Sequence, residues 1–499
     1  MNYCIVQQAE TGKVELPERT AYWSSSLRLD EDGVPFSQGP HGEVFRNVSS
    51  VAFSIGDRGI EYGLVDGCVP LDMTAKRQAA FAWLEKNAIQ VGNALVWNYN
   101  YATQVNDLVV AENWPSAFSQ AAVATRFLMA GCTTGDGKYL EIARDAARAL
   151  LLPVSQGGVR SDDDGFVWFQ EIPVPDQHAP FIVNAHLYSI FTLLVLDRYF
   201  PEENFRKAAL AGLNSLERAF DTIDNGYWNR YDLRPRYSGV DFLIEAEGVH
   251  VRSLTLVQGE TVSSVNFQEQ RKRPSANIVW GDLGKAKDGE ATAFGRRVFA
   301  QFILPEGRSF RPDLLDLPTR FVVEAECCNA VVKLYALGFR PELHEYVELK
   351  ALERTRSGST ERIVFETGLR DFAWGQVAQE YIPFHADLMA LIGRMTSKPD
   401  YLVRAVRWQN FHRNWLKDKA QGHPDLALRE RRGFHPSAEL AEGVASLMGK
   451  RLPHEVSEAE LRSLIGSLAA AKSGKACEGA DTEAARGSQK ALLETLALD

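Results

Sequence analysis

Apolar residues recur at helical spacing in three pairs of neighbouring segments. The first member of each pair is a long apolar run, at residues 115–131, 181–199 and 382–395, and a short breaker with glycine or proline follows it. The second member opens with an aromatic residue and has an alanine four positions later: Tyr139 and Ala143, Phe205 and Ala209, Tyr401 and Ala405. Positions four apart share one helix face, so the pattern predicts three antiparallel helical hairpins, stacked as in an α/α toroid.

The pattern changes between residues 237 and 377, where β-branched and alternating runs predominate. Glycine and proline separate these runs, which include 249–257, 297–303, 320–325 and 362–366. Such runs are typical of β-strands, so we expect a β-rich, sandwich-like insertion and an α+β fold class.

The rest of the chain divides around this insertion. We expect strands and loops over residues 1–60, the first part of the toroid over 61–236, and its closing hairpin over 378–420. A helical or flexible C-terminal tail is expected over 421–499. Within it, residues 472–490 are rich in Ala, Gly, Ser and charged side chains, which is typical of a flexible segment.

The composition narrows the class of protein. Of 499 residues, 45% are hydrophobic and 24% charged, as in ordinary globular proteins. The net charge is −10 and the dense basic stretch at 429–432 is short, so we expect no nucleic-acid partner. The six cysteines form no CxxC pair, and the acidic turn at 162–165 lacks the rest of a calcium-binding loop. We therefore expect no metal and no cofactor.

Targeting signals are equally sparse in the sequence. No apolar run approaches the roughly 20 residues of a membrane-spanning helix, and the N-terminus shows no signal-peptide pattern. The default expectation is a cytoplasmic protein without a transmembrane segment, with homo-oligomerisation left open.

Three segments combine aromatic side chains with carboxylate, amide or arginine groups. They are residues 114–120, residues 168–173 with their continuation 181–188, and residues 225–234, each at the edge of a predicted hairpin. Aromatic rings stack on the apolar faces of sugars, and polar groups bind their hydroxyls and carboxylates. In a toroid such edges line the central cleft, so the segments favour a polysaccharide as the partner.

These segments resemble the C-terminal catalytic domain of the D-glucuronyl C5-epimerases of heparin and heparan sulfate synthesis and of their bacterial relatives. That family shows Trp-x-Ser-Ala-x-x-Gln, Trp-Tyr-Glu-Glu-Tyr-Pro, Leu-Asn-Gly-Phe-x-Tyr-Ser and Tyr-Asp-Leu-Arg in this order. The counterparts here are residues 114–120, 168–173, 183–189 and 231–234, with a looser match from Tyr381 to His385. The resemblance covers roughly residues 60–235 and 378–416, and the β-rich insertion lies outside it.

The resemblance implies inversion of C5 in the D-glucuronate units of a heparosan-like glycosaminoglycan. Such an inversion removes a proton beside a carboxylate and returns one to the opposite face, so two groups must flank the ring. By resemblance, Glu171 and Tyr381 transfer the protons, Tyr231 supports the ring or the proton, and Arg234 holds the carboxylate. The resemblance further implies substrate-binding roles for Asn184, Tyr188, His385, Trp114, Gln120, Trp168 and Tyr227.

The sequence departs from the family at two positions. Ile172 stands where the family has a functional tyrosine, and Gln170 replaces its preceding glutamate. Either Tyr227, Tyr99 or Tyr101 substitutes, or the activity differs. One alternative activity is a uronate polysaccharide lyase, which shares the abstraction of the C5 proton but then expels the C4 oxygen. The other alternative is a non-catalytic glycan-binding protein, which would keep only the cleft.

The residue types alone also fit plainer interpretations. Glu171 could be an exposed turn carboxylate, and Asp232 with Arg234 could be a surface ion pair. His385 could be a core histidine whose hydrogen bonds are made within the protein. Trp114 and Trp168 could be core residues, because tryptophans are more often part of a core than of a binding site.

Overall fold

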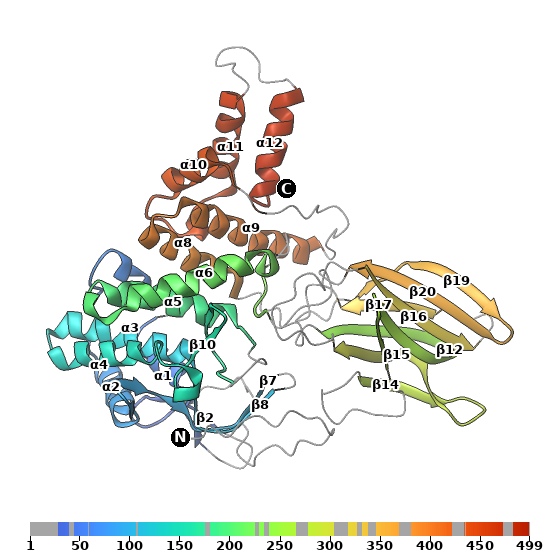
Figure 1. The fold of residues 1–499 in the computed structure, drawn as a ribbon, viewed down its shortest axis with the longest axis horizontal. Coiled ribbons are helices and arrows are strands. Elements are labelled where there is room, and N and C mark those ends of the chain that lie inside the picture. The colour runs from blue at the N-terminus through green and yellow to red at the C-terminus, as the bar shows by residue number, and fades with distance from the viewer. Residues whose placement is uncertain are drawn as a thin grey trace.

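The computed structural model describes residues 28–38, 44–57, 59–105, 108–174, 180–224, 229–233, 239–265, 278–303, 318–326, 332–337, 346–368, 381–421, 434, 436–472 and 483–498. These residues form one region of helices and one large sheet, which lie side by side in Figure 1. The α+β fold class is therefore confirmed.

The three predicted hairpins are present in the described residues. They are α3 (Ala117–Thr134) with α4 (Gly137–Arg148), α5 (Val183–Asp197) with α6 (Phe205–Ile223), and α8 (Tyr381–Thr396) with α9 (Pro399–Gln421). The first helix of each hairpin is buried on almost every side, which explains its long apolar run.

The first helices of the hairpins pack against one another and form the centre of the helical region. Helix α5 contacts both α3 and α8, while the short helix η1 (Ile60–Val65) contacts α3 and α8. Gly131 lets α4 approach α3, because a Cβ atom there would lie 2.5 Å from the Leu140 side chain. A closed toroid stays a prediction.

Smaller elements surround the hairpins. The helices are α1 (Val48–Ser54), α2 (Ala75–Lys86), α10 (Ala438–Met448), α11 (Glu458–Lys472), α12 (Glu483–Thr495), η2 (Val154–Gln156), η3 (Pro201–Glu203) and η8 (Pro453–Glu455). The short strands are β1 (Arg28–Leu29), β2 (Pro35–Gln38), β3 (Val44–Phe45), β4 (Ile89–Val91), β5 (Ala94–Val96), β6 (Asn98–Tyr99), β7 (Thr103–Val105), β8 (Leu108–Val110), β9 (Trp114–Pro115), β10 (Arg160–Asp163) and β11 (Phe166–Phe169). None of the described helices has the length and apolar character needed to span a bilayer.

Part of the segment expected to be flexible is helical. Residues 483–495 form α12, which lies beside α11 at the top of Figure 1. Its C-terminal end is fixed to α9: Asn410 Nδ2 donates to Leu496 O at 2.7 Å, and Asn414 Nδ2 donates to Ala497 O at 2.8 Å. These tertiary bonds satisfy carbonyls at the helix end, a contribution that composition does not reveal.

The described strands of the β-rich region join in a nine-stranded antiparallel sheet. They are β12 (Gly239–Gln258), β13 (Thr261–Ser264), β14 (Ile278–Lys285), β15 (Ala291–Ile303), β16 (Pro318–Glu326), β17 (Val332–Leu337), β18 (Tyr346–Glu348), β19 (Ala351–Ser357) and β20 (Thr360–Gly368). The first half of β12 pairs with β15 and β17, and its second half pairs with β16 and β13. Register shifts after Ala246 separate the halves, and Phe242 meets Phe321 with ring centroids 4.5 Å apart. The two halves therefore share an apolar interior.

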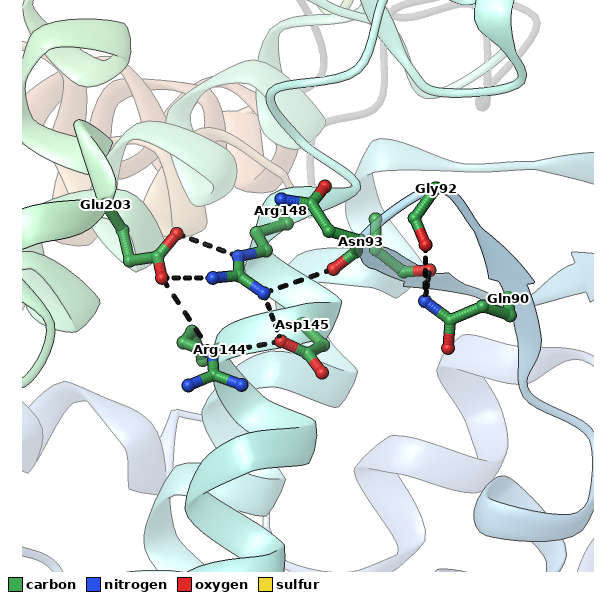
Figure 2. Close-up of polar contacts among 8 residues, drawn as sticks. Gln90, Gly92, Asn93, Arg144, Asp145, Arg148 and Glu203 are labelled. Carbon is green, nitrogen blue, oxygen red and sulfur yellow. Dashed lines mark hydrogen bonds and ion pairs between the residues drawn. The ribbon is translucent and has the colours of Figure 1, made fainter.

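Arg148 on α4 links two hairpins and a strand pair on the outside of the helical region (Figure 2). Its Nε donates to Glu203 Oε2 in η3 at 2.7 Å, and Nη2 bonds to the other oxygen of the same carboxylate. Its Nη1 donates to Asn93 O in the β4–β5 turn at 3.3 Å and to Asp145 at 2.8 Å. A forked arginine–carboxylate pair is among the stronger polar contacts, so this group fixes the α5–α6 turn against α4.

Removing this fork is expected to destabilise the helical region. We predict that Arg148→Ala lowers the free energy of unfolding by about 1–2 kcal/mol, because charge-assisted bonds in a part-buried site are lost. Calorimetry should show a lower melting temperature. Lys138→Ala, which removes an exposed ion pair to Glu85 from the same helix, should show no measurable change. Equal melting temperatures for wild type and Arg148→Ala would contradict the assignment.

Candidate active site

The strand pair β10–β11 and the start of α3 position Glu171. The carbonyl of Gln170, directly before it, accepts a hydrogen bond from Ala117 N at 2.9 Å. Ala117 is the first residue of α3, and no side chain caps this helix. The Ala117 N–H group has no partner within the helix, so it bonds to the loop that carries Glu171.

Tyr231 is held in the same way by the start of α5. Its carbonyl accepts from Val183 N, the first helical residue, at 2.8 Å. Tyr381 is the first described residue of α8, and its ring centroid lies 5.1 Å from that of Tyr231. The starts of three inner helices thus meet at one point.

The carboxyl group of Glu171 lies at this meeting point. Tyr231 Oη donates to Glu171 Oε1 at 3.5 Å, while Oε2 is buried and has no hydrogen-bond partner among the described residues. Burial raises the pKa of Glu171 to about 7, although the neighbouring donors of Asn184 and Tyr231 oppose the shift. The group can therefore bind or release a proton near neutral pH, as a general base must.

Asn184, in the first turn of α5, is buried beside Glu171. Its amide is close enough to act on the Glu171 carboxyl group, but within the described residues neither amide atom makes a well-formed hydrogen bond. Buried amides are normally satisfied. A buried unsatisfied amide next to a buried unsatisfied carboxyl oxygen is the arrangement that a polar ligand would complete.

Tyr231, Tyr381 and His385 form a row of rings. Burial, with the charge of Glu171 as the next contribution, raises the pKa of Tyr231 well above its ordinary value, so this phenol keeps its proton. His385 lies one turn after Tyr381 on α8, with ring centroids 6.3 Å apart. Its Nδ1 lies 3.1 Å from Asn229 Oδ1, on the same loop as Tyr231.

Gln120 and Trp114 are buried and support the segment before α3. Gln120 Nε2 donates to Trp97 O at 2.9 Å, and Trp114 Nε1 donates to Tyr101 O at 3.0 Å. The Trp114 ring packs on Tyr99 with centroids 4.3 Å apart. Both side chains make structural contacts within the protein, and their predicted contact with substrate stays a prediction.

Trp168 is also buried and belongs to a stack behind the site. Its ring lies flat on His186, with centroids 3.7 Å apart, and its Nε1 donates to Ile182 O at 3.2 Å. His186 Nδ1 accepts from Phe169 N at 3.1 Å, and Nε2 lies 3.1 Å from Gly212 O. Burial lowers the pKa of His186 to about 3, so a neutral imidazole joins β11, α5 and α6.

Tyr188 lies deeper, at the centre of the inner helices. Its Oη donates to Glu61 Oε1 at 2.8 Å, and Glu61 Oε2 pairs with Arg126 Nη1 at 2.9 Å. All three side chains are fully buried. A role of Tyr188 in substrate binding stays a prediction, because its observed hydrogen bonds are with Glu61 on η1 and Thr125 on α3.

Of Tyr99 and Tyr101, the two described tyrosines that could substitute for the missing phenol, Tyr99 has the clearer connection to Glu171. Ile172 points into the core, so it presents no polar group to the site. Burial raises the pKa of Tyr99 to about 12, hydrogen bonds to Ser49 and Ser119 oppose this, and the charge of Glu171 adds to it. Tyr101 instead accepts from Asn47 Nδ2 at 3.4 Å.

Two predicted site residues, Tyr227 and Arg234, lie outside the described residues. Sequence reasoning did not name Asn229 or His186 as site residues, although both fall inside segments that were singled out. In the described part of the chain, no group of three or more His, Cys, Asp or Glu side chains could hold a metal ion.

Part of this chain is similar in sequence to a known family. The family model of the D-glucuronyl C5-epimerase C-terminus matches residues 91–265. A D-glucuronyl C5-epimerase of Caenorhabditis elegans is 29% identical over 172 residues, which are 31% of this chain and 27% of that protein. An uncharacterised protein of Methanocaldococcus jannaschii is 28% identical over 146 residues, 28% of this chain and 45% of that protein. The match therefore spans less than half the length of each relative.

The neutral His186 makes stability depend on pH. Its pKa is about 3 in the fold and 6.5 ordinarily, so between these values the unfolded chain binds the extra proton and stability falls as pH falls. We predict that, between about pH 6 and 4, the free energy of unfolding of the wild type falls by about 1.4 kcal/mol per pH unit more than that of His186→Gln. Urea unfolding at several pH values measures both slopes. Parallel slopes would show that His186 is not held neutral.

Proposed function

We propose that this chain, a divergent member of the D-glucuronyl C5-epimerase family, inverts C5 of D-glucuronate units in a heparosan-like polysaccharide. The observation that carries the proposal is the carboxyl group of Glu171. It is buried, half unsatisfied, and has a pKa of about 7 beside two tyrosines.

Glu171 acts as the base in this proposal. Its ionised carboxylate takes the C5 proton, the C5–H bond breaks, and the electron pair moves into the substrate carboxyl group as an enolate. The Tyr381 phenol then gives a proton to the opposite face of C5. Tyr231, which donates to Glu171 and packs on Tyr381, passes the proton held by Glu171 back to the Tyr381 phenolate. No proton is gained or lost over the cycle.

The helix starts supply the electrostatic part of the proposal. The N-terminal end of a helix carries a partial positive charge, and α3, α5 and α8 begin at the site. An enolate beside a carboxylate concentrates negative charge, so this arrangement favours the intermediate. In the proposal Arg234 adds a cation for the substrate carboxylate, Asn184 binds a substrate oxygen, and Tyr99 supplies the phenol that Ile172 lacks.

The polymer would lie across the edge where these helices begin. The contacts among α3, α5, α8 and η1 support a toroid with its cleft at this edge.

The most direct test is exchange of the C5 proton. Purified protein is incubated with heparosan in deuterated water, and deuterium at C5 and new iduronate signals are followed by NMR. We expect both signals for wild type and a loss of about 10²–10⁴-fold for Glu171→Gln. Asp162→Asn, which removes an exposed carboxylate from the neighbouring strand, should keep the wild-type rate.

Two other results would change the proposed function. Unsaturated uronate, detected by its ultraviolet absorbance, would make the protein a lyase with the same first step. Binding of uronate polymers with neither exchange nor cleavage would leave a glycan-binding protein.

The rate should also follow the ionisation of Glu171. The carboxylate is the active form, so kcat/KM should rise about tenfold per pH unit below pH 7 and level off above it. The measurement is the exchange rate at polymer concentrations well below KM between about pH 5 and 8. A rate that is already level at pH 5 would exclude Glu171 as the base.

A further inference from the structure

The loop that carries Tyr231 is attached to the protein through Asn229. Asn229 forms a backbone bridge with Asp224 at the end of α6, and Arg230 N donates to Ile223 O at 2.8 Å. The side chain of Asn229 points the other way, with Oδ1 3.1 Å from His385 Nδ1 on α8. Asn229 therefore connects α6, the loop and α8.

Asp224 makes this attachment rigid. Arg407 on α9 donates to both of its oxygens, Nε at 2.9 Å and Nη2 at 3.2 Å. Trp408 Nε1 donates to the same carboxylate at 3.2 Å. These side chains are buried, so the ion pair is little screened by solvent, and breaking it would be costly.

The His385 ring is confined between aromatic neighbours. Trp408 lies 6.4 Å from it and Tyr381 lies 6.3 Å from it, centroid to centroid. Both His385 and Asn229 are at most 2% exposed. Since an amide oxygen only accepts, the bond requires the imidazole proton on Nδ1, which leaves the lone pair of the neutral ring on Nε2.

The bond also runs beside the tyrosine contact. Tyr231 is two residues after Asn229 on the loop, and Tyr381 is one helical turn before His385 on α8. A change at Asn229–His385 therefore alters the separation of the two phenols, now 5.1 Å between ring centroids.

We propose that Asn229 is a positioning residue: it fixes the Nδ1–H form of His385 and holds the Tyr231 loop against Tyr381. The inference rests on the proposed epimerisation, because it concerns the two phenols to which that reaction assigns proton transfer. Among the described residues Asn229 makes no hydrogen bond to either phenol, so its task is to position them.

The test uses the full chain labelled with ¹⁵N-histidine. Asn229→Leu removes the acceptor at similar size, and Asn229→Asp keeps an oxygen at the same place. Imidazole ¹⁵N shifts report which ring nitrogen carries the proton, and His385→Gln identifies the signal. Exchange at C5 gives kcat and KM for each variant.

We expect wild-type His385 to be protonated on Nδ1 and unprotonated on Nε2. In Asn229→Leu the signal should move toward a mixture of tautomers, with kcat reduced about 10–100-fold and KM little changed, because misplaced groups slow chemistry more than binding. Asn229→Asp should keep the Nδ1 proton and recover most of kcat.

Three results would overturn the proposal. They are a wild-type His385 protonated on Nε2 alone, an unchanged kcat in Asn229→Leu, and equal losses in the Leu and Asp variants despite a retained tautomer in the latter. If Asn229→Leu fails to fold, the wild-type tautomer and the Asp variant still decide. Absence of exchange in wild type would instead remove the proposed function, while the tautomer spectrum would still report the hydrogen bond.

Discussion

The site depends on two backbone hydrogen bonds at the starts of inner helices. A helix leaves its first N–H groups without partners, and here Ala117 N bonds to the carbonyl of Gln170 and Val183 N to that of Tyr231. Each bond fixes one loop, and each loop carries one residue of the candidate site. Because helices of neighbouring hairpins begin at the same edge, Glu171 and Tyr231 arrive together, in a region where helix dipoles favour negative charge.

Burial sets the pKa of Glu171. Glu61 is equally buried, but Arg126 and Tyr188 bond to its two oxygens, so its carboxylate is compensated and structural. Among the described residues no cation pairs with Glu171, and the donors beside it, the Tyr231 phenol and the Asn184 amide, are both neutral. The two buried glutamates therefore differ in the set of neighbours that satisfies the carboxylate.

Much of the fold could be predicted, because its cause is local. Buried inner helices require long apolar runs, and glycine or proline ends them, so 115–131, 181–199 and 382–395 reveal the hairpins. The contacts that complete the site are different. His385 and Asn229 are 156 positions apart, and such pairs leave no periodic signal in one sequence. The motif indicated Glu171 and Tyr231, but neither the burial of Ile172 nor the neutral His186 could be read from residue types. The first part of α12, over residues 483–490, was expected to be flexible, but it is helical because contacts with α9 stabilise a segment of weakly apolar composition.

The measurement that tests this account most directly is the titration of the Glu171 carboxyl group by ¹³C NMR, with Glu171→Gln to identify its signal. The account holds that burial without a compensating cation keeps this group poised for proton transfer. It predicts a titration midpoint of about 7. A midpoint near the ordinary value of 4.5 would show a solvated carboxylate and would contradict the assignment of Glu171 as the base.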